Sequence, residues 1–201
     1  MCYSLSQEQI KIVLEIVQTL AIIAASWVAI RGVNAWEKEF QGKRKIELAE
    51  EALYLFYRAE WAVEAIRFPV YDLAQGQTRQ PESDETPEQR QARDRAYVTF
   101  KKIMEQGQIF DELHKLRFRF MVRFGKENEK LFDDLKRIVD EIKVSARELA
   151  ELWTENTNVE EIKHHKSIIW SGRADDAIKG RLEKIISDIE EICKPIILGK
   201  K

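Results

Sequence analysis

A run of fifteen residues without a charge, Ile16–Ile30, constrains the fold of this chain more than any other feature. As a helix it would cover about 22 Å, less than the roughly 30 Å core of a bilayer. Ile12–Leu14 lengthen it on one side, and Glu15 can then snorkel or take up a proton near the interface. On the other side lies Trp36, a residue type favoured at headgroup depth. We therefore expect a transmembrane helix over residues 10–33, after a short external N-terminus, residues 1–9.

Two other interpretations compete with a membrane span: a buried core helix and a cleaved secretory signal. A core helix usually has one apolar face, whereas Ile16–Ile30 is apolar all round. A signal peptide begins with bases and ends in a small-x-small site, whereas here Glu8 precedes the first base, Lys11, and no such site closes the run. The sequence favours an uncleaved span.

The bases that flank the run predict its orientation. Lys11 is the single base before it, and five bases follow closely: Arg31, Lys38, Lys43, Arg44 and Lys45. Basic residues accumulate on the cytoplasmic side of membrane helices. We therefore expect a protein of the cell inner membrane, with its N-terminus outside and residues 34–201 in the cytoplasm. Lys43, Arg44 and Lys45 would contact lipid headgroups.

The rest of the chain has the composition and periodicity of helices. Only 4 of 201 residues are proline and 8 are glycine, and apolar residues recur at spacings of three and four. The helix from the membrane should continue to Arg67, with Gly42 as the most favourable kink, and an exposed loop should cover residues 70–85. Helices follow from Thr86 to Gly125 (dented at Gly107), from Leu131 to Trp153, and up to Pro195, with ENTN at 155–158 as an interruption. The predicted class is all-α: a transmembrane helix that continues into a cytosolic antiparallel helical bundle.

Charge and motifs argue against several functions. The 33 basic and 35 acidic residues nearly balance, so nucleic acid is not expected as the main partner. Neither GxGxxG nor GxxxxGK occurs, and no serine lies in a Gly-x-Ser-x-Gly turn. We expect no enzyme and no cofactor.

Metal binding is weakly indicated at most. Asp111-x-x-His114 and Glu161-x-x-His164 have the i,i+3 spacing of di-iron bundles, but such sites need two Glu-x-x-His motifs and two further glutamates. Cys2 and Cys193 would lie on opposite sides of the membrane, which excludes a bond between them. We expect no metal site, and a role for Cys193 as a small apolar residue.

Leu113–Glu127 is the densest mixture of basic and aromatic residues. On a helix, Lys115, Arg119 and Arg123 fall on one face. Arginine suits phosphate and carboxylate, so this face is a candidate site for an anionic small ligand, an acidic lipid headgroup, a neighbouring subunit or a cytosolic protein. The alternative is that the arginines pair with acids nearby while the phenylalanines face the core.

The apolar run carries a stripe of small and polar residues. Such residues in lipid usually face another helix, and one helix per subunit offers them no partner. We therefore expect the chain to form a homo-oligomer through this stripe, either as a simple dimer or around a narrow polar path. The oligomer-facing or pore-facing candidates are Glu15, Gln18, Thr19, Ile22 and Ser26.

In layout, the whole chain resembles short bacterial single-pass membrane proteins with a cytosolic helical domain, some of which are effectors of defence systems. The resemblance has no diagnostic motif and transfers no site residues. It implies a non-enzymatic, channel-like or membrane-disrupting effector that its cytosolic domain controls. The alternative is a membrane-tethered scaffold that recruits a cytosolic partner and conducts nothing.

Overall fold

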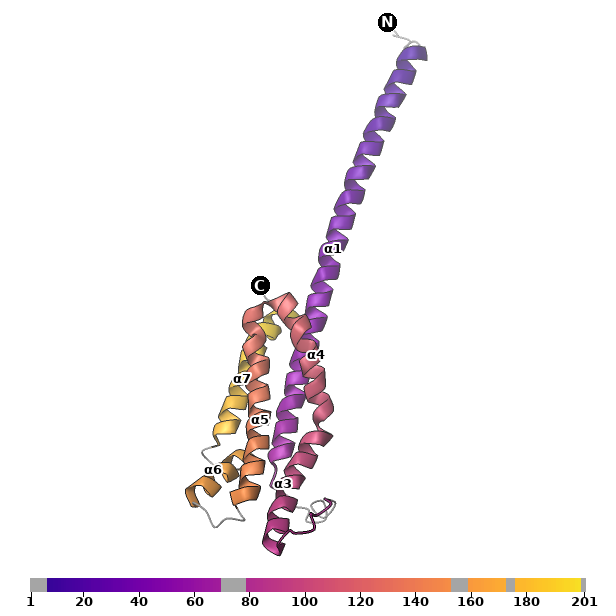
Figure 1. Cartoon of the computed structure of the whole chain (residues 1–201). Coiled ribbons are helices and arrows are strands. Elements are labelled where there is room, and N and C mark those ends of the chain that lie inside the picture. The colour runs from indigo at the N-terminus through magenta and orange to yellow at the C-terminus, as the bar shows by residue number, and fades with distance from the viewer. Residues whose placement is uncertain (1–6, 70–78, 153–158, 173–175, 200–201) are drawn as a thin grey trace. The chain divides into compact units, whose positions relative to one another are not determined.

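The computed structural model describes residues 7–69, 79–152, 159–172 and 176–199, and no strand occurs among them. The elements in chain order are α1 (Gln7–Arg67), α3 (Pro87–Glu105), α4 (Gly107–Phe124), the short 3₁₀ helix η1 (Lys126–Asn128), α5 (Glu129–Leu152), α6 (Val159–Ile169) and α7 (Ala177–Ile197) (Figure 1). A long apolar N-terminal helix thus leads into a helical domain, which confirms the predicted all-α class.

The chain divides into two compact units, Met1–Lys45 and Ile46–Lys201. Helix α1 runs through this boundary, and it is uninterrupted at Gly42, where the sequence suggested a kink. The predicted bundle begins at residue 34, whereas the second unit begins at Ile46. We refer below to Ile46–Lys201 as the helical unit and to Ile46–Arg67 as the bundle stretch of α1.

The core of the helical unit forms where the bundle stretch of α1 packs among α4, α5 and α7. Alanines at three- and four-residue spacing on α1 let the neighbouring helices approach closely. Phe56 of α1 meets Phe132 of α5 edge to face, with ring centroids 5.1 Å apart. The side chains that are almost completely buried include Ala49, Ala52, Phe56, Ala59, Ala62, Val63, Leu116, Phe120, Ile138, Ile142 and Ile189.

Local sequence signals explain where several helices begin and end. Thr86 and Gln89 form a capping box: the Gln89 N–H donates to Thr86 Oγ1 at 3.2 Å, and the Thr86 N–H donates to Gln89 Oε1 at 3.0 Å. The predicted dent near Gly107 is a true break, because α3 ends at Glu105 and α4 begins at Gly107. Gly125 ends α4 with a φ of 102°, a conformation that glycine adopts without strain.

The end of α7 and the loop before α3 differ from the expectation. Helix α7 continues beyond Pro195 to Ile197, because the Leu198 N–H still donates to Lys194 O at 2.9 Å and only the N–H that proline lacks is lost. Of the predicted loop, residues 80–84 are exposed. Ion pairs largely cover the side chains of Arg79 and Glu85 at its end. The remaining loop residues 70–78, ENTN at 155–158 and Trp153 lie outside the described residues.

Candidate functional site

The first candidate region is the apolar part of α1 within the unit Met1–Lys45. Helix α1 is long and apolar enough to cross a membrane, and its most apolar 18-residue window has a mean hydropathy of 1.7. None of that window is buried within the chain. Large apolar side chains such as Leu20, Ile23 and Trp27 are more than half exposed. The helical unit packs most of its apolar residues into a core, whereas this segment leaves its apolar residues uncovered.

The predicted polar stripe lies on this segment, and Glu15, Gln18, Thr19, Ile22 and Ser26 are all exposed. Thr19 Oγ1 donates a hydrogen bond to the backbone oxygen of Glu15, one turn earlier, at 2.8 Å. A threonine that bonds its own helix in this way needs no acceptor on a neighbouring helix. Thr19 therefore no longer argues for an oligomer, and the argument depends on Glu15, Gln18 and Ser26.

The basic cluster at the end of this unit makes contacts within its own helix. Lys43 Nζ lies 3.0 Å from Glu39 Oε1, and the Arg44 guanidinium lies 4.5 Å from the ring centroid of Phe40. Lys43, Arg44 and Lys45 are all exposed. Exposed ion pairs of this kind contribute little to stability.

On α4, the structure supports the ion-pairing alternative for Arg119. Its guanidinium makes two contacts of 3.0 Å with the carboxylate of Glu51 on α1. Arg123 is exposed and has an interaction within the chain. Lys115 is exposed as well. The three predicted residues thus share an outer face of α4, and at Arg119 an acid of the same chain already occupies the anion position.

Arg117 is the best-paired base of α4, and the sequence reasoning missed it. It lies 2.6 Å from Glu129 and 2.7 Å from Asp133, and its Nε is buried without a hydrogen-bond partner. The hydrogen bond from Arg117 holds the pKa of Glu129 below its ordinary value. Its position, four residues after Leu113 and three before Phe120, was a signal that Arg117 borders the apolar face.

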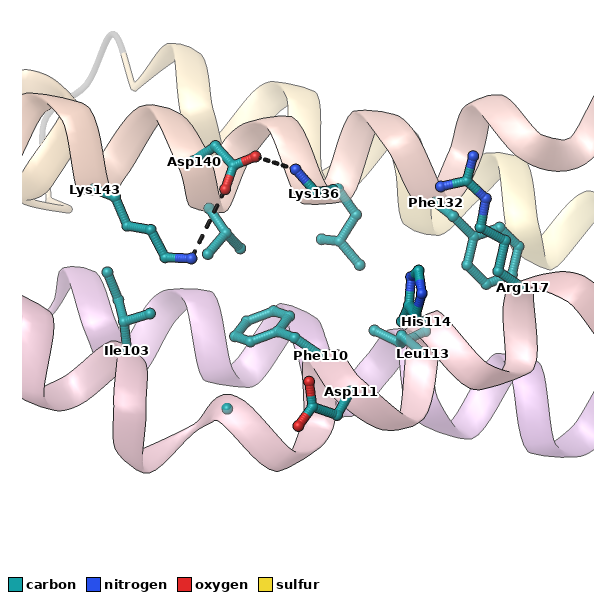
Figure 2. Close-up of a pocket in the computed structure, with 13 residues that line it drawn as sticks. Ile103, Phe110, Asp111, Leu113, His114, Arg117, Phe132, Lys136, Asp140 and Lys143 are labelled. Carbon is teal, nitrogen blue, oxygen red and sulfur yellow. Dashed lines mark hydrogen bonds and ion pairs between the residues drawn. The ribbon is translucent and has the colours of Figure 1, made fainter.

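A groove of about 300 Å³ lies between α4 and α5 (Figure 2). Its floor is apolar, and Gly107 in its lining borders open space, since a Cβ there would meet nothing within 4 Å. On the rim, Asp140 pairs with both Lys136 and Lys143, so most of the charge is neutralised. A small apolar group with at most one negative charge suits such a site. The lining includes Ile103, Phe110, Leu113, Phe132, Leu135 and Val139 on the floor, and Asp111, His114, Arg117, Lys136, Asp140 and Lys143 on the rim.

A buried ion pair joins the end of α1 to the start of α7. Arg67 makes two hydrogen bonds to the Asp176 carboxylate, at 2.8 and 2.9 Å. It also donates to the backbone oxygens of Ile168 (2.8 Å), Ser167 (3.0 Å) and Trp170 (3.2 Å). Both side chains are only 4% exposed. Asp176 caps α7 as well, accepting from the Lys179 N–H at 3.1 Å, so this pair fixes three helix ends together.

The histidines and the described cysteine form no obvious reactive centre. Among the described residues, no three His, Cys, Asp or Glu side chains are grouped so as to hold a metal ion. His114 belongs to α4 and His164 to α6. Cys193 is fully buried, and desolvation raises its pKa to about 12, so the thiol stays protonated. Cys2 lies outside the described residues.

Comparison with protein-family models, with curated proteins and with solved structures finds no match for this chain.

Proposed function

We propose that this chain is a non-enzymatic single-pass membrane protein of the inner membrane, which forms a homo-oligomer through the apolar part of α1. Its N-terminus lies outside and its helical unit in the cytoplasm. The assembled helices act as a channel-like or membrane-disrupting effector, and the helical unit controls them.

The observation that carries this proposal is the contrast between two parts of one chain. The helical unit packs a core of large apolar side chains, whereas the most apolar window of α1 has no buried residue at all. Exposed apolar area costs about 25 cal/mol per Å² in water, so such a helix needs a cover. A bilayer supplies that cover along the whole length of the segment.

Length and composition would also suit a core helix or a signal sequence, and one experiment separates these from a span. Membranes that contain the full chain with a C-terminal tag are washed with alkaline carbonate and floated on a density gradient. The mass of the tagged protein is then measured by mass spectrometry. A membrane-spanning protein stays in the membrane fraction with residues 10–33 intact. Release into the carbonate supernatant, or loss of the N-terminal segment, would refute the proposal.

The channel-like part depends on the polar face of the segment. Glu15, Gln18, Ile22 and Ser26 follow one another at three or four residues and therefore share one side of α1. In an oligomer, that side can line a polar path. Purified protein in dye-loaded vesicles should release the dye, and Gln18→Leu with Ser26→Leu should reduce the release. Ile23→Leu serves as the matched control.

A scaffold without conduction is the second candidate, and the groove between α4 and α5 favours it. Its apolar floor and largely neutralised rim can receive a side chain of a cytosolic partner or a small ligand. The same vesicle assay separates the two functions. Stable membrane insertion without any dye release would support the scaffold.

A further inference from the structure

Two stripes of unlike charge run along the outer surface of the helical unit. The acidic stripe, on the bundle stretch of α1, consists of Glu47, Glu50, Tyr54 and Trp61. The basic stripe, on α4, consists of Lys115, Phe118, Val122 and Arg123. All eight side chains are exposed.

Each stripe combines its charges with large apolar groups that the core does not use. Tyr54 and Trp61 are 58% and 61% exposed, and Phe118 and Val122 are 55% and 89% exposed. Helix α4 already buries a separate apolar face in the core, which includes Leu113 and Leu116. Aromatic residues gathered on a surface are typical of protein interfaces.

The two stripes are neighbours on one surface. Ion pairs join their helices at two levels: Glu51 with Arg119 at 3.0 Å, and Arg58 with Glu112 at 3.2 Å. Since residue numbers rise along α1 as they fall along α4, the two helices are antiparallel and lie side by side (Figure 1). At the level of Glu51 and Arg119 the acid lies on α1 and the base on α4, as in the two stripes, whereas at the level of Arg58 and Glu112 the order is reversed.

A surface with this arrangement complements itself under a two-fold rotation. Suppose that a second copy faces the first and that the two-fold axis runs parallel to the bundle stretch of α1. The rotation then exchanges the two sides of the seam but keeps the level of each residue along it. The acidic stripe of each copy then lies opposite the basic stripe of the other, as an isologous interface requires. The Ile46 ends of both copies also point the same way, which suits two copies with one orientation in one membrane.

We infer that a second copy of this chain docks on this surface, so that the helical units dimerise across the seam between α1 and α4. The inference rests on the proposed membrane span, because that span supplies the common orientation. Contact energy comes chiefly from Tyr54, Phe118 and Val122, which lie at similar levels along the seam, and the charges select this register over others. Each copy contributes both stripes, so the interface contains two equivalent halves.

Crosslinking tests the predicted pairing directly. Tyr54→Cys and Phe118→Cys are placed on separate, differently tagged full-length chains in a Cys2→Ser background, and the chains are reconstituted together in lipid vesicles. A short bis-maleimide should join Tyr54→Cys to Phe118→Cys. Val144→Cys is the control, because Val144 is 52% exposed but belongs to α5 and to neither stripe, and it should give little product with either chain.

Charge reversal tests the selectivity in the same assay. Glu47→Lys with Glu50→Lys gives a chain with two basic stripes, and Lys115→Glu with Arg123→Glu gives a chain with two acidic stripes. Each variant alone should crosslink at least about fivefold less, because like charges then face each other. Mixing the two variants should restore the product, now between unlike chains. All four sites are exposed, and circular dichroism of each variant checks its fold.

The outcomes are distinct. Crosslinking of Tyr54→Cys to Phe118→Cys, with loss and recovery on charge reversal, supports the inference. Equal product at Val144→Cys, or no recovery on mixing, overturns it. Absence of crosslinking in protein that floats with the vesicles overturns the dimer surface and leaves the span standing, whereas protein that fails to float refutes the proposed function itself.

Discussion

Replacing Arg67 by methionine should destabilise the helical unit strongly. The substitution keeps an aliphatic side chain but removes five hydrogen bonds, two to Asp176 and three to the backbone oxygens of Ser167, Ile168 and Trp170. The Asp176 carboxylate would stay only 4% exposed and lose its counter-charge. Breaking a buried ion pair from one side costs about 3–5 kcal/mol.

That loss is a large share of the roughly 5–15 kcal/mol by which a typical domain is stable. With a urea m-value of about 2 kcal/mol/M, the unfolding midpoint should fall by about 1.5–2.5 M. The assay is urea unfolding of the full chain in mild detergent, followed by far-ultraviolet circular dichroism. Arg119→Met is the matched control: its ion pair with Glu51 is exposed and should be worth less than about 1 kcal/mol. Equal midpoint shifts for the two variants would refute the reasoning.

Three further predictions concern single residues. Burial would raise the pKa of Asp176, but the hydrogen bond and charge of Arg67, with the Lys179 N–H, outweigh burial and hold that pKa below its ordinary value. The stabilisation that ionised Asp176 contributes is therefore complete above its unfolded pKa of about 3.9 and is lost as the pH falls through its folded pKa. When the free energy of unfolding is measured against pH in acid, the chain should show this loss and Asp176→Asn should lack it. Gly180→Ala should stabilise α7 by about 0.5–1 kcal/mol in urea unfolding, since a Cβ there meets nothing within 4 Å, and a loss of stability would contradict this. In a Cys2→Ser background, Cys193 should react with maleimide at pH 8 only after unfolding, because burial raises its pKa to about 12; rapid labelling of the folded chain would show that the thiol is accessible.

Much of the fold followed from local sequence chemistry. The capping box at Thr86, the glycine at the end of α4 and the inward row of α7 (Ile178, Leu182, Ile185, Ile186 and Ile189) depend on residues close together in the chain. Periodicity and caps report such contacts directly.

The sequence did not predict the interactions that join elements distant from one another in the chain. Arg67 and Asp176 are 109 positions apart, and nothing near Arg67 in the sequence distinguishes it from a surface base at a helix end. Arg119 and Glu51 are 68 positions apart, so the sequence could offer ion pairing only as an alternative. Which charges meet depends on how the helices pack, and helical periodicity shows only which face each residue occupies.

In the candidate site, too, the local patterns could be predicted from the sequence and the contacts that depend on packing could not. The sequence located the apolar segment of α1 and its polar face, because both are local patterns. It did not reveal that Thr19 bonds its own backbone, or that the stripes on α1 and α4 lie side by side. The first depends on a rotamer, and the second on tertiary packing.

The central claim is that α1 crosses the membrane once, with its N-terminus outside, and native Cys2 allows a direct test. Intact cells that express the full chain are treated with a membrane-impermeant maleimide before and after lysis. The account predicts that Cys2 reacts in intact cells, whereas Val144→Cys in a Cys2→Ser background reacts only after lysis. Labelling of Val144→Cys in intact cells, or protection of Cys2 until lysis, would contradict it.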